Sequence, residues 1–430
     1  MKFPNEEAVE GVLDAVPFPE FADVRYEPPA PAVDDPGAAA RRELDALPLD
    51  SVPEGGRVAV GLGSRGIHDI VPIAAAVVDE LRGRGFEPVA VPAMGSHGGA
   101  TADGQRRTLG SLGLTEERLG CPIDARMETT VLGESDLGRP VHVSTAALEA
   151  DGILVLNRVK PHTNFEGSVE SGVCKMAAIG LGKQRGASAV HDAALVRSYV
   201  SAITSTFEVV RRETPFLGGL GIVENFYDRT AVVRGLPAES LPDAEGDLLE
   251  RAREYMATLP YEEIDVLVVD EMGKDISGTG MDTNVIGRFR VLNEDDPERP
   301  EVKRIFARGL TEATHGNGHG IGLADVTTTG AVESLDLDQM YANALTSGSL
   351  SKSSLPVALP NDRLALTAAL TSFGPYDPET AGVVWIRDTS HLSSFRVSPA
   401  LVAEGGEHVT VEGRSRLAFD DGAARFEPIE

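Results

Sequence analysis

The sequence predicts an α/β protein built from two α/β domains with mostly parallel sheets. Short apolar runs typical of buried strands alternate with amphipathic helical segments over most of the chain. At roughly 150 residues per domain, a chain of 430 residues corresponds to two or three domains. Hydrophobic residues make up 42% of the chain, so it can bury its cores without disulfides. These three observations favour a folded protein of this class.

In the first half, a Pro- and Ala-rich link over residues 27–41 precedes a regular alternation of strands and helices. Runs of Val, Ile and Leu predict strands, and apolar residues three or four positions apart predict helices. Gly85 marks the end of the first helix, because glycine commonly follows a helix C-terminus. The expected elements are a strand at 57–63, a turn at 64–66, a helix at 68–85, a strand at 86–93, a Gly-rich loop at 94–105 with a helix beginning near Ala102, and strands at 151–159 and 218–225.

The second half repeats this alternation and predicts a second domain. A helix at 243–259 leads through Pro260 into a new apolar strand, so we place the domain boundary near residue 261. The expected division is an N-terminal domain over 1–260 and a C-terminal α/β domain over 261–400, with the functional site in the cleft between them. The strand-like tail at 401–430 is expected to pack back on the first domain. Further expected elements are a strand-containing segment at 318–328, a helix at 337–347 and strands at 355–360 and 382–388.

The charge balance limits the partners of the protein. With 39 Lys and Arg against 67 Asp and Glu, the net charge is −28, which repels nucleic acid and anionic membrane surfaces, and the sequence has no basic patch to offset it. Lysine is scarce, and three of the seven lysines fall between residues 160 and 183. Low Lys, high Arg and abundant acidic residues resemble the proteins of salt-in halophilic archaea.

Cysteine usage and hydropathy predict a cytoplasmic protein. Cys121 and Cys174 are too few for a disulfide framework, and they form no Cys-x-x-Cys zinc motif. The first sixteen residues lack the basic and apolar regions of a signal peptide, and no apolar run of 18 residues occurs. We therefore expect neither secretion nor membrane insertion.

Unusual polar side chains follow three of the predicted strands. Because ligands of parallel sheets bind outside the carboxyl ends of the strands, these positions are candidates for a binding site. Arginine and lysine bind anions, and histidine transfers protons near neutral pH. The pattern predicts a cleft that binds an anion and transfers protons, although each loop histidine alone is also compatible with a turn or capping role. The side chains are Ser64 and Arg65 after the first strand, Ser96 and His97 after the second, and Lys160 and His162 after the third.

Two further candidates follow in the Gly- and Ser-rich segment 160–191. Lys175 lies in an apolar stretch at 173–182, where burial would lower the pKa of its amine and favour a nucleophile; the alternative is a lysine at a helix end that extends to solvent. We expect His191 to begin a helix, as either a metal ligand or a surface residue.

Taken together, these positions resemble the nickel-dependent lactate racemase (LarA-like) family. The resemblance covers residues 57–191 and depends on the order Arg, His, His, Lys, His, with His191 sixteen positions after Lys175. It implies that His97 and His162 are the catalytic pair and that Lys175 is the covalent attachment point of the cofactor. It also implies that Ser64, Arg65 and Lys160 contribute to cofactor binding and that His191 is the nickel ligand.

The implied cofactor is the nickel-pincer nucleotide, Ni pyridinium-3,5-bisthiocarboxylic acid mononucleotide. The implied activity is that of an isomerase, a racemase or epimerase of a 2-hydroxy acid, in which a hydride leaves the α carbon and returns to either face of a keto acid. The two histidines would alternate as base and acid on the hydroxyl group. The partners implied are a small 2-hydroxy acid and cofactor maturation proteins, with no nucleic acid and no membrane.

The sequence departs from the family in the region expected to contact substrate. Leu62 occupies the position of a family aspartate, and Thr279, Gly280 and Thr283 stand where the family has a Tyr-Gln pair followed by a lysine. The interval from His162 to Lys175 is also slightly longer. We therefore expect the cofactor apparatus to be retained and the substrate to differ from lactate.

Two other functions remain possible from sequence. A non-catalytic protein that binds a small anion or a cofactor would need Arg65 and Lys160, but not both His97 and His162. An NAD-type oxidoreductase is disfavoured, because residues 61–66 match Gly-x-Gly-x-x-Gly only superficially and the predicted helix begins beyond them.

The charge of −28 predicts that the fold depends on salt. In dilute buffer, repulsion among the acidic side chains destabilises the compact state, and added KCl screens this repulsion. We expect the melting temperature to rise as KCl is increased towards molar concentration. Thermal melts over a KCl series measure this, and a melting temperature that does not change with salt would contradict the interpretation.

Overall fold

The protein is described here from a computed structural model, which covers residues 2–429 and divides into two compact units. Unit 1 comprises the chain up to Pro28, the short segment Thr163–Phe165 and the chain from Ala257 onward. Unit 2 comprises residues 29–162 and 166–256. The boundary at 256/257 lies close to the expected one near 261. The first 28 residues, which the expected N-terminal domain 1–260 includes, fall in unit 1 with the C-terminal half.

Unit 2 is organised around a five-stranded sheet with the order β3-β2-β6-β7-β8. The first four strands are parallel to one another, and β8 is antiparallel to β7. This arrangement confirms the predicted α/β class. The strands of unit 2 are β2 (Arg57–Leu62), β3 (Glu87–Pro92), β4 (Thr129–Glu134), β5 (Pro140–Ser144), β6 (Gly152–Arg158), β7 (Phe216–Glu224) and β8 (Thr230–Pro237). The α-helices are α2 (Pro36–Glu43), α3 (Ile70–Gly83), α4 (Ala102–Ser111), α5 (Glu116–Leu119), α6 (Thr145–Leu148), α7 (Val173–Lys175), α8 (Lys183–Ala194), α9 (Tyr199–Glu213) and α10 (Asp243–Tyr255).

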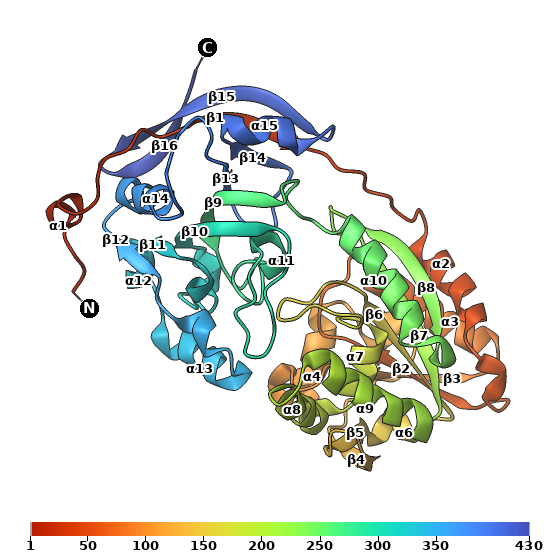
Figure 1. The fold of residues 1–430 in the computed structure, drawn as a ribbon. Helices are drawn as coiled ribbons and strands as arrows, with labels where there is room; N and C mark the ends of the chain where they lie inside the picture. The colour runs from red at the N-terminus through yellow and green to blue at the C-terminus, as the bar shows by residue number, and fades with distance from the viewer. Residues whose placement is uncertain (1, 430) are drawn as a thin grey trace. The chain divides into compact units, whose positions relative to one another are not determined.

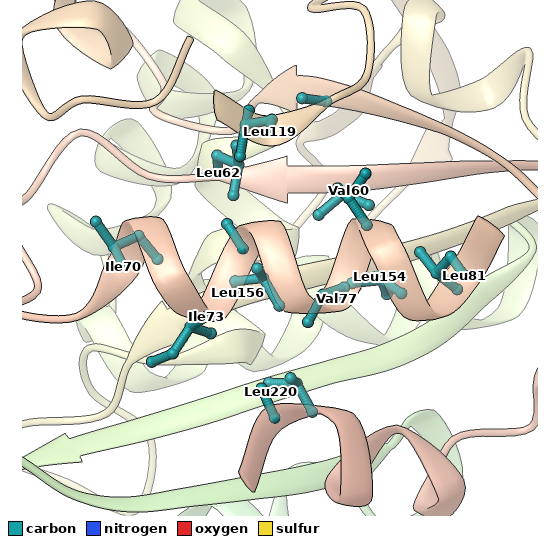
Figure 2. Packing of buried hydrophobic residues seen from close by; sticks show 14 of the residues in the cluster. Val60, Leu62, Ile70, Ile73, Val77, Leu81, Leu119, Leu154, Leu156 and Leu220 are labelled. Atoms are coloured by element: carbon teal, nitrogen blue, oxygen red, sulfur yellow. The ribbon is translucent and has the colours of Figure 1, made fainter. Parts of the chain in front are cut away.

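One face of this sheet is covered by α3, as predicted from the apolar spacing of its sequence. Ile70, Ile73, Val77 and Leu81 lie three or four positions apart and are all buried. Figure 2 shows these side chains directed at a layer of strand residues. That layer includes Val60, Leu62, Leu154, Leu156 and Leu220 from β2, β6 and β7. This packing holds the strands that end at the candidate site.

The segment after β6 packs on β6 and β7. It begins with α7, continues as a π-helical turn at Met176–Gly180 and then enters α8. Two glycines permit its close approach. A Cβ on Gly219 of β7 would lie 3.1 Å from Val173 Cγ1 of α7, and one on Gly180 would lie 2.5 Å from the carbonyl oxygen of Ala93. The backbone therefore fits where side chains would collide.

Unit 1 contains a nine-stranded sheet with the order β12-β11-β10-β9-β13-β14-β1-β15-β16. The strands from β12 to β13 are parallel, and the remaining neighbours are antiparallel. Its strands are β1 (Glu20–Tyr26), β9 (Glu263–Met272), β10 (Glu301–Leu310), β11 (Val326–Thr328), β12 (Val357–Leu359), β13 (Val383–Ile386), β14 (Ser394–Val397), β15 (Val409–Asp420) and β16 (Ala423–Pro428). Its α-helices are α1 (Glu6–Glu10), α11 (Thr283–Ile286), α12 (Thr329–Glu333), α13 (Leu337–Ser347), α14 (Asp362–Thr371) and α15 (Pro399–Val402).

The two ends of the chain belong to this sheet. β1 pairs with β14 on one side and with β15 on the other, so the red N-terminal strand lies among blue C-terminal strands in Figure 1. Phe21 on β1 makes edge contacts with Trp385 and Phe426, at ring-centroid distances of 6.2 and 5.3 Å. The 401–430 tail, which we expected to pack on the N-terminal domain, pairs with β1 at the beginning of the chain and completes the sheet of unit 1.

The short segment Thr163–Phe165 is the only internal part of unit 1 that interrupts unit 2 among the described residues. Thr283 Oγ1 donates a hydrogen bond to the carbonyl oxygen of Thr163 at 3.0 Å. Lys352 Nζ donates to Asn164 Oδ1 at 2.6 Å, and Phe165 is fully buried. These contacts attach the residues that directly follow His162 to unit 1.

Over residues 2–429, none of the helices combines the length and the apolar character needed to cross a lipid bilayer.

Candidate functional site

The candidate residues lie in the loops that follow three neighbouring strands of unit 2. β2 occupies the position between β3 and β6, and Leu62 at its end pairs with Pro92 on one side and Leu156 on the other. The three loops therefore begin at the same edge of the sheet. Ser64 and Arg65 follow β2, Ser96 and His97 follow β3, and Lys160 and His162 follow β6.

Ser64 and His97 are in direct contact. The Ser64 hydroxyl and His97 Nδ1 form a short hydrogen bond, which joins the loops after β2 and β3. Burial lowers the pKa of His97 to about 4, with further contributions from the positive charges of Arg65 and Lys175. His97 is therefore a neutral imidazole at neutral pH. If Nδ1 carries the proton and donates to Ser64, Nε2 has a free lone pair and can accept a proton.

His162 is held through its backbone. Its N–H donates a short hydrogen bond to a carboxylate oxygen of Glu170, and the other oxygen accepts from the Gly167 N–H at 3.1 Å. Glu170 is 1% exposed and is paired with Arg253 of α10, which compensates its charge. The His162 ring stacks on Tyr199 with a centroid distance of 6.4 Å. The loop after β6 is thus closed around one buried carboxylate.

Lys175 lies at the end of α7, where the chain changes to a π-helical turn. Such turns interrupt α-helical geometry and occur frequently at functional sites. The N–H groups of Val173 and Cys174 both donate to one carboxylate oxygen of Glu245, the second bond measuring 3.0 Å. Glu245 is 1% exposed, and burial raises its pKa to about 7. This side chain from α10 fixes the first turn of the segment that carries Lys175.

The Lys175 amine is surrounded by other positive groups. Burial lowers its pKa to about 7, the charges of Arg65 and Lys160 lower it further, and Glu170 partly opposes them. At neutral pH, a substantial fraction of the amine is therefore unprotonated and nucleophilic. Because the groups that shift this pKa come from the loops after β2 and β6, Lys175 belongs to the same site.

His191 also faces this group, although it lies in the last turn of α8 and does not begin a helix as expected. Its Nδ1 lies 3.3 Å from the hydroxyl of Tyr199, and the two rings meet edge to face at 5.8 Å. Burial lowers the pKa of His191, the Lys175 charge lowers it further, and Asp192 opposes them. A neutral imidazole with Nδ1 on a hydroxyl leaves Nε2 as the atom available to a metal.

Four polar residues of this site were not predicted from sequence: Glu170, Tyr199, Glu245 and Gln105. Three are buried groups that bond the backbone of the loops and helix carrying the candidate residues, and Tyr199 contacts both His162 and His191. Glu245 bonds Cys174 from 71 positions away in sequence, and Glu170 and Gln105 bond irregular loops, so no periodic pattern marks them. The clustering of lysines in the sequence offered one signal, because Lys183, the third of them, is buried and bonds Gln105.

Within residues 2–429, no three His, Cys, Asp or Glu side chains lie together as a metal site. A metal here would therefore take most of its ligands from a cofactor, with His191 as the protein ligand. The donor set fits a nucleotide cofactor in other respects. Lys175 offers an amine for covalent attachment, and Arg65 and Lys160 offer positive charge for a phosphate.

The positions at which the sequence differs from the resembled family lie in unit 1 or in a core. Thr279 Oγ1 donates to the Met281 carbonyl oxygen at 2.6 Å, and Thr283 bonds Thr163 as described above. Leu62 is fully buried under α3. These residues serve packing and backbone contacts.

Compared with protein-family models and with curated proteins, the sequence gives no match.

Removing the Lys175 charge should change the titration of His97. In a Lys175→Met variant, the pKa of His97 should rise from about 4, because one of two neighbouring positive charges is gone. It should remain below 6.5, because burial and Arg65 still favour the neutral ring. NMR titration of the imidazole C–H signals measures this. Lys303→Met is the control, since that lysine pairs with Asp265 in unit 1. An unchanged His97 pKa in Lys175→Met would show that the Lys175 charge does not act on His97.

Proposed function

We propose that this protein is a racemase or epimerase of a 2-hydroxy acid that uses a nickel-pincer nucleotide attached to Lys175. The observation that carries the proposal is the Lys175 amine, whose pKa is lowered to about 7 among Arg65 and Lys160 and whose charge acts on both His97 and His191. A nucleophilic amine, a phosphate-binding pair of cations and a single metal-binding imidazole are the groups that such a cofactor requires.

In this proposal the cofactor is held by residues of unit 2. Lys175 Nζ would form the covalent link, Ser64, Arg65 and Lys160 would bind the polar groups of the cofactor, and His191 Nε2 would hold nickel. The other metal donors would come from the cofactor itself. When bound, the cofactor supplies the acceptor for the hydride of the substrate α carbon.

The chain itself supplies the proton transfers. His97 or His162 accepts the proton of the substrate hydroxyl as the carbonyl forms, and the other histidine returns a proton when the opposite enantiomer is made. The neutral state of His97 suits the role of base. An anionic substrate, or the loss of the Lys175 charge on covalent attachment, removes part of the electrostatic effect that lowers the His97 pKa and makes the ring a better base.

The charges also favour a second candidate, a non-catalytic protein that binds a small anion. Arg65, Lys160 and Lys175 would suffice for that role. The hydrogen bond between His97 and Ser64 favours the catalytic proposal, because anion binding alone does not require an oriented neutral imidazole. The experiments below distinguish the two.

Protein matured in its native host should carry a covalent adduct on Lys175 and about one equivalent of nickel per chain. Intact mass, tryptic mass spectrometry and metal analysis of the same sample measure both. His191→Ala should keep the fold and lose nickel, because one of the four ligands is removed. His408→Ala is the matched control, since that histidine lies in unit 1 and its substitution should leave nickel unchanged. Unmodified Lys175 in fully active protein would remove the tethering proposal.

The racemisation should proceed with internal return of hydrogen. With a panel of 2-hydroxy acids and sugar acids in deuterated water, we expect inversion with little deuterium at the α carbon. Either His97→Ala or His162→Ala should lower the two-way rate by roughly 10²- to 10⁴-fold, the usual contribution of positioned acid–base catalysis. Optical rotation and NMR follow the two quantities. Complete α-deuteration from the first turnover would instead indicate proton abstraction without a hydride acceptor.

A further inference from the structure

Lys183 is a buried lysine that the proposed chemistry does not use. It is 1% exposed, and its Nζ donates hydrogen bonds to the carbonyl oxygen of Pro92 at 2.7 Å and to Gln105 Oε1 at 3.0 Å. Both acceptors are uncharged. Burial lowers the pKa of Lys183 to about 8, opposed by the more distant charges of Asp124 and Glu128. Burying a cation without a directly bonded carboxylate costs stability, so this lysine calls for an explanation beyond packing.

Gln105 connects Lys183 to the loop that carries His97, because it hydrogen-bonds both. Its side chain is fully buried, and Nε2 donates to the carbonyl oxygen of Gly95 at 2.9 Å and lies 3.4 Å from that of His97. A lysine only donates hydrogen bonds, so the amide oxygen must face Lys183. The amide nitrogen is then directed at the two carbonyl oxygens. The lysine thereby sets the orientation of the amide.

The same lysine is placed between the other two parts of the site. It is the first residue of α8, eight positions after Lys175 and eight before His191, and it adopts a left-handed φ of +53°. Just before it, the carbonyl oxygen of Gly180 in the π-helical turn accepts from the Gly95 N–H at 3.1 Å. The loop after β3 is therefore bonded to the start of α8, to the π-helical turn and to α4.

We propose that Lys183 and Gln105 are positioning residues that hold the loop at 94–97 so that His97 meets Ser64 at the site. This inference rests on the proposed function for the importance of His97, but its geometry is independent of any cofactor. The Lys183–Gln105 pair acts on the backbone on both sides of Ser96, while the Ser64 bond acts on the ring of His97. Backbone and ring are thus fixed separately.

The test uses the cofactor-free full chain and the His97 imidazole signals in NMR. Lys183→Met keeps an unbranched side chain that is one heavy atom shorter, and removes both hydrogen bonds of the ammonium group. We expect the His97 pKa to rise from about 4 by about one pH unit or more, because the ring moves away from the positive charges of Arg65 and Lys175 and becomes more fully solvated. Lys352→Met is the matched control, since Lys352 is equally buried in unit 1, bonds Asn164 and should leave the His97 titration unchanged.

Gln105→Glu separates positioning from stability. The new carboxylate still accepts from Lys183 and gains an ion pair, but it cannot donate to the Gly95 and His97 carbonyl oxygens and repels them. We expect a melting temperature at or above that of the parent chain together with the raised His97 pKa. The new negative charge also raises the His97 pKa by itself, so the deciding readout is the NMR contact between the His97 ring and Ser64, which a purely structural role leaves in place in this variant. That result overturns the proposal even if Lys183→Met does not fold.

A holoenzyme assay separates this inference from the proposed function. If matured protein racemises 2-hydroxy acids, Gln105→Glu should lower kcat by roughly 10²-fold with little change in KM, the size of effect expected from a displaced catalytic group. If no 2-hydroxy acid reacts but the His97 titration moves as expected, the proposed function fails and the positioning role stands. If the parent enzyme is active but the His97 titration does not move in the variants, the proposed function stands and the positioning role fails.

Discussion

The parallel pairing of β3, β2 and β6 is the constraint on which the candidate site depends. The three strands are distant in sequence, yet their register places Pro92, Leu62 and Leu156 side by side. The loops that follow must therefore meet at one edge. The packing of α3 on one face of the sheet stabilises this register, because a shift by one residue would turn Val60 and Leu62 away from their apolar partners.

A second layer of buried charged groups stabilises the loops that this pairing brings together. Glu170 bonds the backbone of His162, Glu245 bonds the turn before Lys175, and Lys183 acts through Gln105 on the loop of His97. Each bonds peptide groups, which fixes the position of a reactive side chain without occupying its functional atoms. The reactive side chains themselves are dominated by positive charge, so the energetics of the site favour an anionic occupant.

Much of this could be predicted from sequence because it depends on local patterns. The apolar spacing of α3 and the runs of β2, β3 and β6 gave these elements nearly as the structure has them, and strand-end chemistry identified Arg65, His97 and Lys160. The place of the N-terminus in unit 1 has no local signal, because it depends on the pairing of β1 with β15, almost 400 residues away. Glu245 was missed for the same reason, since a helix residue that bonds a distant turn leaves no periodic signal. Family membership and activity stay predictions.

The excursion of the chain at Thr163–Phe165 has a mechanical consequence. The peptide bond after His162 is the point where the chain passes from unit 2 to unit 1, and its two sides are anchored differently. On one side Glu170 bonds the His162 N–H, and on the other Thr283 and Lys352 bond the next two residues. Hydrogen bonds on both sides therefore restrict backbone rotation at this peptide bond, and the main chain of His162 has little freedom to rearrange.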